Sequence, residues 1–175
     1  MTASTVVSTR LTAGSVLAKG RQDAELIVAD FAEEVATTSI DEVGDVVVFG
    51  ELPWNAKIKS ILIYNDDLDT HATPTLAADV GLFKVDADGT ATVLDADAYA
   101  SAITTLQAAN KTGVEVAFES GVKDINEADS DLTVMEDGGL SAVPLGYRAA
   151  LGLKVTTEAA TAAAGTVKLV VKYTL

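Results

Sequence analysis

Few residues of this chain could take part in chemistry, and the densest group is the acidic run Asn65–Asp66–Asp67–Leu68–Asp69. Its three carboxylates could supply oxygen ligands to a hard cation such as Ca²⁺, which needs several. A polar loop has the same composition, and the run lies between an apolar pattern ending at Tyr64 and another beginning near Thr75. We favour the loop, so no metal site is predicted.

A second acidic stretch, Asp86-Ala87-Asp88-Gly89-Thr90, begins like a calcium-binding loop. It lacks the ligands and the glycine that such a loop carries at its later positions. Because glycine adopts positive φ without steric penalty, Asp88–Gly89 instead predicts a hairpin turn between residues 83–85 and 92–94.

Catalytic options are limited by a single histidine, His71, and by the absence of cysteine. Ser60 and Asp69 are the nearest candidates for a triad with His71, but neither stands in a G-x-S-x-G frame. Without cysteine there is no disulfide, zinc–thiolate site or thiol nucleophile. The sequence therefore predicts that the protein is not an enzyme, with no catalytic residue, metal or cofactor.

Charge restricts the partners. The chain has 175 residues with 26 acids against 12 bases, a formal net charge of −14. An acidic surface repels nucleic-acid phosphates and anionic membranes, so we expect neither as a partner. A partner must be basic, or the repulsion must be screened by salt. Met1 to Lys19 shows no signal-peptide pattern, which predicts that the protein is made in the cytoplasm and either stays there or is assembled there into something larger.

Residues 1–20 are rich in Ser, Thr, Ala and Gly and have no strand or helix period, which predicts an extended N-terminal arm. Residues 21–175 are expected to form one domain. Trp54, after Pro53, is either an anchor in the core or at a strand edge, or a residue that contacts a partner. The candidate interface residues are Val6, Val7, Leu11, Val16, Leu17 and Trp54.

Period-2 alternation of apolar residues recurs along the domain and predicts a mainly-β fold, a β-sandwich or jelly-roll-like domain. Residues 57–64 place Ile58, Leu62 and Tyr64 on one face and Ile61 and Ile63 on the other. One helix is expected at about 95–109, because Tyr99, Ile103 and Leu106 have helical spacing. The strands are predicted at 25–31, 45–49, 57–64, 75–85, 114–118, 151–155 and 167–175.

Three neighbouring segments carry a family resemblance: LPWNAKI at 52–58, SILIYNDDLD at 60–69 and TLAADVGLF at 75–83. They resemble small virion proteins of tailed bacteriophages, of the type that decorates or cements the capsid. The resemblance implies a β-domain on the capsid surface, bound to the major capsid protein, homo-oligomeric with a trimer favoured, and without a cofactor. Such a protein is made in the host cytoplasm.

Two functions remain open on sequence. The first is a structural virion protein that binds and stabilises or decorates a phage capsid through protein–protein contacts. The second is a surface- or glycan-binding adhesion module of a fibre or appendage. Sheet sandwiches serve both roles, so the fold does not choose between them. Aromatic residues make up only 5% of the chain, and sugar sites commonly use them, which favours the capsid role.

Overall fold

The computed structural model describes residues 25–117 and 131–175. Within these residues, no helix has the length and apolar character that crossing a bilayer requires. The strands are β1 (Ile27–Val35), β2 (Val46–Leu52), β3 (Lys57–Asn65), β4 (Ala77–Val85), β5 (Ala91–Ile103), β6 (Asn110–Glu115), β7 (Arg148–Thr157) and β8 (Gly165–Thr174); the short helical elements are η2 (Thr37–Ser39), η3 (Thr105–Gln107) and α1 (Val134–Asp137).

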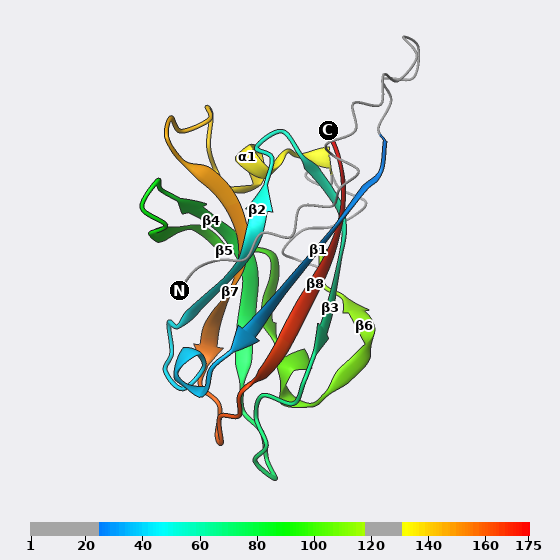
Figure 1. Ribbon diagram of the computed structural model, residues 1–175, viewed down its shortest axis with the longest axis vertical. Coiled ribbons are helices and arrows are strands. Elements are labelled where there is room, and N and C mark those ends of the chain that lie inside the picture. The colour runs from blue at the N-terminus through cyan, green and yellow to red at the C-terminus, as the bar shows by residue number, and fades with distance from the viewer. Residues whose placement is uncertain (1–24, 118–130) are drawn as a thin grey trace.

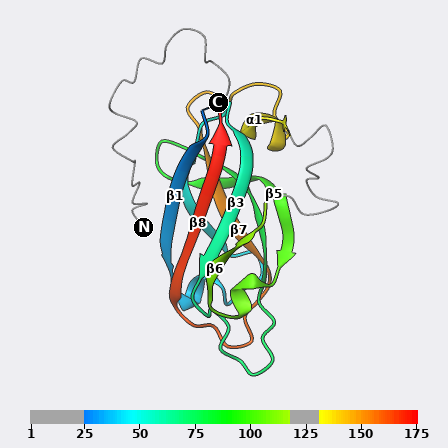
Figure 2. The same ribbon diagram turned by 90° about the vertical axis from the view of Figure 1, so that its right-hand side faces the viewer.

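The strands form two antiparallel sheets packed as a sandwich, with the orders β1-β8-β3-β6 and β2-β7-β4-β5 (Figures 1 and 2). The first strand pairs with the eighth, the second with the seventh, the third with the sixth and the fourth with the fifth. The chain is thus one long hairpin, with its tip between β4 and β5, rolled around a core. This is a jelly roll, which confirms the predicted mainly-β, sandwich or jelly-roll-like fold.

The core follows from strand alternation. In β8, Val167, Leu169 and Val171 are fully buried, while Lys168, Val170 and Lys172 on the opposite face are partly exposed. In β3 the predicted faces are wrong, because the pairing with β8 shifts register between Ile58 and Ser60. This bulge lets Ile58, Ile61 and Ile63 all face the core, and a bulge of this kind adds a residue to one strand without breaking the sheet.

The helix expected at about 95–109 is wrong: residues Ala91–Ile103 form β5, and only the short turn η3 follows. The pairing explains the misleading pattern, because Leu82 lies opposite Asp95 while Val80 lies opposite Ala100. β5 has four residues between these two pairs where β4 has only Gly81, so β5 bulges there. Buried Tyr99 and Leu106 lie on either side of irregular pairing, and their spacing imitates that of helical turns. Pairing with β4 overrides the helix propensity of the alanines.

The bulge in β5 depends on Gly81. A Cβ atom at this position would overlap the backbone carbonyl groups of Asp95 and Ala96. We therefore expect Gly81→Ala to lower the free energy of unfolding by about 3 kcal/mol, since the obstacle is backbone and cannot rotate away. Urea denaturation measures the loss.

Gly139→Ala is the control. Gly139 has a φ of +69° but nothing within 4 Å of an added Cβ, so only the backbone conformation opposes the change. We expect a loss of about 1 kcal/mol for this variant. Equal losses at the two positions would contradict the close approach of β5 to Gly81.

Candidate functional site

The carboxylate of Asp69 is the best-connected group in the acidic loop. Its side chain is only 1% exposed, and its two oxygens accept hydrogen bonds from backbone N–H groups on two separate loops. The donors are Thr75 at 2.7 Å, Leu76 at 3.0 Å, Ala160 at 3.0 Å and Thr161 at 2.9 Å, with His71 at 3.4 Å. The carboxylate therefore organises the loops and has little capacity left for a cation.

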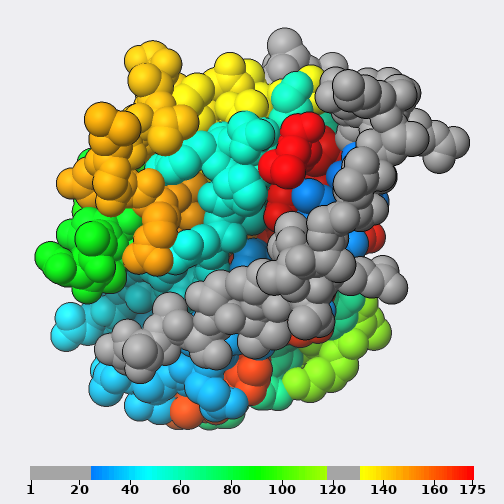
Figure 3. Space-filling view, turned by 45° about the horizontal axis from the view of Figure 1, so that its top comes forward, coloured from blue at the N-terminus to red at the C-terminus, as the bar shows by residue number. Residues whose placement is uncertain are grey.

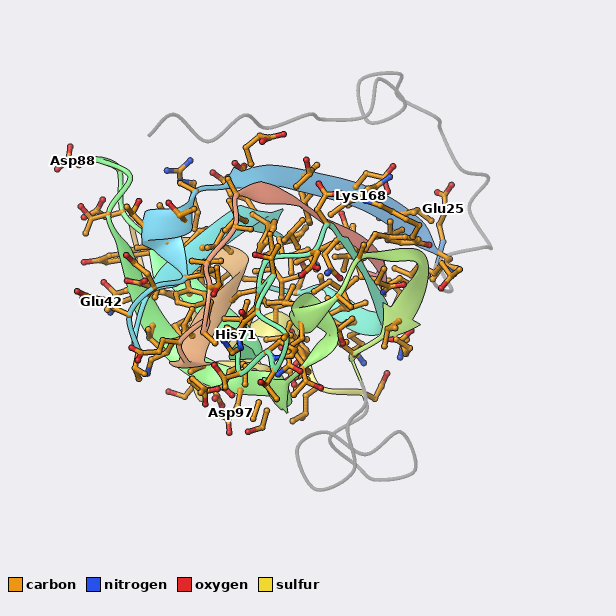
Figure 4. The ribbon with its side chains drawn as sticks, turned by 90° about the horizontal axis from the view of Figure 1, so that it is seen from below. Glu25, Glu42, His71, Asp88, Asp97 and Lys168 are labelled. Atoms are coloured by element: carbon orange, nitrogen blue, oxygen red, sulfur yellow. The ribbon has the colours of Figure 1, made fainter. Side chains whose placement is uncertain are left out.

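Burial alone would raise the pKa of Asp69. The hydrogen bonds from the backbone N–H groups of Thr161, Thr75, Leu76 and Ala160 outweigh that effect and lower the pKa below its ordinary value. The carboxylate is therefore ionised in the folded protein at neutral pH. Figure 4, which views the molecule from below, labels His71, two residues after Asp69 in the same loop.

The other carboxylates of the run are also engaged in local structure. Asp66 bonds the Lys111 ammonium at 2.5 Å and the backbone N–H of Thr166 at 2.8 Å, and these contacts lower its pKa. Asp67 accepts a hydrogen bond from the backbone N–H of Asp69 at 3.2 Å. Among residues 25–117 and 131–175, no group of three or more His, Cys, Asp or Glu side chains is placed to hold a metal ion.

The candidate triad residues are not brought together. His71 is exposed, and its Nδ1 lies 3.0 Å from the backbone nitrogen of Thr73 in the same loop. The Ser60 hydroxyl donates to Glu115 at 2.5 Å, near the opposite end of β3. Asp69 contacts backbone groups, as described above. Each of the three groups has a structural partner of its own.

The turn predicted at Asp88–Gly89 is confirmed. It connects β4 to β5, and Gly89 has a φ of +84°. The Asp86 carboxylate accepts hydrogen bonds from the backbone N–H groups of Asp88 at 3.0 Å and Thr90 at 2.8 Å. This carboxylate stabilises the hairpin tip.

Trp54 is half-buried against the core and ties together three segments. Its indole N–H donates to the Tyr147 carbonyl at 3.2 Å, and its own carbonyl accepts from the Met135 N–H at 3.0 Å. The segment around α1 is held to β3 by Asp131, which bonds the side chains of Lys57 and Lys59, and these bonds lower the pKa of Asp131 to about 2. Trp54 is thus an anchor, and its role as a partner contact stays a prediction.

The remaining interface candidates, Val6, Val7, Leu11, Val16 and Leu17, lie outside the described residues, as does the arm at 1–20.

A groove of about 520 Å³ lies between β1 and β2, and sequence reasoning missed it. Glu33 lines it, with one carboxylate oxygen buried and without a hydrogen-bond partner among the described residues. Burial raises the pKa of Glu33. Arg148 lines the groove too, paired with Glu51 and donating to the Asp86 carbonyl at 3.1 Å. The sequence did carry a signal, because Glu33 shares the inward register of β1 with Phe31 and Val35.

Removing the Asp69 carboxylate should unfold the loops it joins. We expect Asp69→Ala to lower the free energy of unfolding by about 3 kcal/mol, because several buried N–H groups lose their acceptor. Asp67→Ala is the matched control in the same loop and should lose less than ~1 kcal/mol. Chemical denaturation compares the two, and equal losses would contradict the role of Asp69.

The same residue predicts a pH dependence with a definite sign. Because folding lowers the pKa of Asp69, its stabilisation is complete above the unfolded pKa of about 3.9 and is lost as pH falls below that value. The difference in unfolding free energy between wild type and Asp69→Asn should therefore shrink from pH 5 to pH 2. A difference that stays constant would contradict the lowered pKa.

Calcium should leave the melting temperature unchanged. A ligand that binds only the folded state must raise stability by mass action, and the carboxylates of Asp66, Asp67 and Asp69 already have partners. Differential scanning calorimetry in millimolar calcium and in chelator tests this. A rise of several degrees in calcium would reveal a cation site in the acidic loops.

Comparison with known proteins gives matches among solved structures. No family model matches the chain, and no curated protein matches it. A chain from the capsid asymmetric unit of cyanophage Pam1 matches with a TM-score of 0.58 and 26% identity, covering 87% of this chain and 86% of that one. A chain from the capsid of Ralstonia phage GP4 matches with a TM-score of 0.58 and 23% identity, covering 86% and 84%.

The second match shows the fold alone, since its identity is low, and the first adds sequence similarity over the same extent. Together they confirm that the chain resembles phage capsid proteins, as residues 52–83 had indicated. This chain shares its fold, over most of its length, with chains of phage capsids, and it resembles a capsid-associated protein of a tailed bacteriophage.

Proposed function

We propose that this protein is a structural component of a phage virion, which binds the major capsid protein at the capsid surface and stabilises or decorates the shell. The observation that carries the proposal is the match to capsid chains over more than four fifths of both partners. We further propose that it acts as a homo-oligomer, with a trimer favoured by the family resemblance.

An exposed apolar loop before β7 supports a role in protein–protein contact. Leu145 is 94% exposed, and Val143 and Tyr147 in the same loop are also exposed. The amber atoms of this stretch stand out from the molecule in the space-filling view (Figure 3). Exposed apolar residues gathered in one loop are typical of surfaces that bind another protein.

The proposal assigns the work of the chain to binding and not to catalysis. His71, Ser60 and Asp69 each have separate structural roles, which supports this assignment. The alternative, a glycan- or surface-binding module of a fibre or appendage, has less support, because most described aromatic side chains are not exposed: Phe31, Phe49, Phe83, Tyr99 and Tyr173 are buried, Trp54 and Tyr64 are half-buried, and Tyr147 is the exposed one among them. Buried rings offer no stacking surface to a sugar.

Leu145→Asp tests the proposed capsid contact. If the loop is buried against the shell, a charge at this position should weaken binding to capsids lacking the protein by at least about tenfold. Co-sedimentation with such capsids measures the affinity, and cryo-EM of the native particle shows where the copies sit.

Val43→Asp is the matched control, since Val43 is 63% exposed in a different loop. It should bind as wild type does. If wild-type protein fails to bind capsids, or if the particle holds no density for it, the proposed function is wrong.

A further inference from the structure

The groove between β1 and β2 has the geometry of a strand-binding site. β1 and β2 are edge strands of different sheets. Among the described residues, each pairs with a strand on one side only. They touch where the Phe31 ring packs on Gly50, a position with no room for a side chain, and residues of both strands line the groove beside this contact. Free strand edges can bind an extended segment through backbone hydrogen bonds.

The residues that line the groove indicate which kind of segment could bind there. Its floor is apolar, with Val35, Phe49, Val85 and Ala150. Glu33, Glu34 and Asp88 add carboxylates, and none of these three forms an ion pair with a described residue. An apolar strand that carries basic side chains would complement this surface.

One segment of the chain has that composition. Residues 1–22 contain Arg10, Lys19 and Arg21 and no acid, in a chain whose formal net charge is −14. When extended, residues Val6 to Leu11 place Val7 and Leu11 on one face and Arg10 on the other, since side chains alternate along a strand. Such a segment offers apolar contacts to the floor and a cation to the rim.

The direction of β1 indicates that the segment comes from another copy. β1 runs from Ile27 towards the groove, which its last residues line, so the N-terminal segment leaves the strand at the far end. Figure 4 shows Glu25 and Asp88 on opposite sides of the molecule. The same chain would have to reverse and run back along β1, whereas a neighbouring copy can enter directly. The fifteen residues from Leu11 to Glu25, when extended, span about 50 Å.

We infer that the groove between β1 and β2 binds the N-terminal segment, residues 1–22, of a neighbouring copy as an added strand. This inference rests on the self-association in the proposed function and names the surface that carries it.

Disulfide cross-linking tests the inference on the full chain, whose lack of cysteine makes introduced thiols unique. Copies with Leu11→Cys are mixed with copies with Val46→Cys, in the groove, and oxidised. Non-reducing electrophoresis should show cross-linked pairs. Val114→Cys is the matched control. Val114 lies in β6, at the edge opposite β1 in the sheet β1-β8-β3-β6, and it is 41% exposed, whereas Val46 is 38% exposed.

Charge exchange gives a second readout that does not depend on the position of one thiol. Glu34→Lys with Asp88→Lys should weaken self-association by about tenfold in analytical ultracentrifugation. Adding Arg10→Glu and Lys19→Glu should restore it. Asp97→Lys with Glu158→Lys changes the charge equally at exposed acids outside the groove and should leave the oligomer unchanged.

Three results would overturn the inference. They are a chain that stays monomeric, a bond that forms only within one chain carrying both Leu11→Cys and Val46→Cys, and a charge exchange that restores nothing. Capsid binding is measured separately through Leu145. If the protein binds capsids but fails these tests, the proposed function stands and the inferred binding in the groove is wrong. If it passes these tests but does not bind capsids, the inferred binding in the groove stands and the proposed function is wrong.

Discussion

One buried carboxylate holds the two sheets in place at one end of the sandwich. Every connection in the fold except the hairpin tip crosses from one sheet to the other, so the sheets depend on their loops. Asp69 lies in the β3–β4 loop and bonds backbone groups of both that loop and the β7–β8 loop. A charged acceptor shared by several backbone donors is stronger than separate neutral hydrogen bonds. The Asp69 side chain therefore fixes two of the loops that connect one sheet to the other.

The loops fixed by Asp69 lie at one end of the sandwich, and the exposed apolar loop lies at the other end. The loop that carries Leu145 precedes β7, whereas the Asp69 loops lie beyond the other end of that strand (Figure 1). Trp54 joins the base of this loop to the β2–β3 link, so the exposed apolar residues stand on a fixed support. A rigid support reduces the ordering cost of binding. This combination of a stable sheet core and an anchored apolar loop suits the structural role that we propose for the protein.

The charge of the molecule sets a second constraint. Copies with a net charge of −14 repel one another, so close association needs local attraction or burial of apolar surface. The chain separates its charges, with no acid before Asp23. Glu33, Glu34 and Asp88 line the groove between β1 and β2 and form no ion pair with another described residue. In the assembly that we infer, this separation would set attraction between the N-terminal segment and the groove against the general repulsion. The same arrangement would give hydrogen-bond partners to the edges of β1 and β2 that have no strand partner among the described residues, and unpartnered edges are prone to unspecific pairing.

The sequence by itself determined the mainly-β class, the hairpin tip at Asp88–Gly89 and the final strand, β8, because these follow from local alternation and from the φ preference of glycine. It also identified the acidic run as a loop. It failed at β5 and within β3, where bulges break the two-residue period and only pairing with a neighbouring strand reveals them. The role of Asp69 and the groove beside Glu33 likewise came from the tertiary structure, because their partners lie far along the chain. Local patterns carry conformational preference, but which distant backbone groups meet a side chain is decided by how the sheets pack.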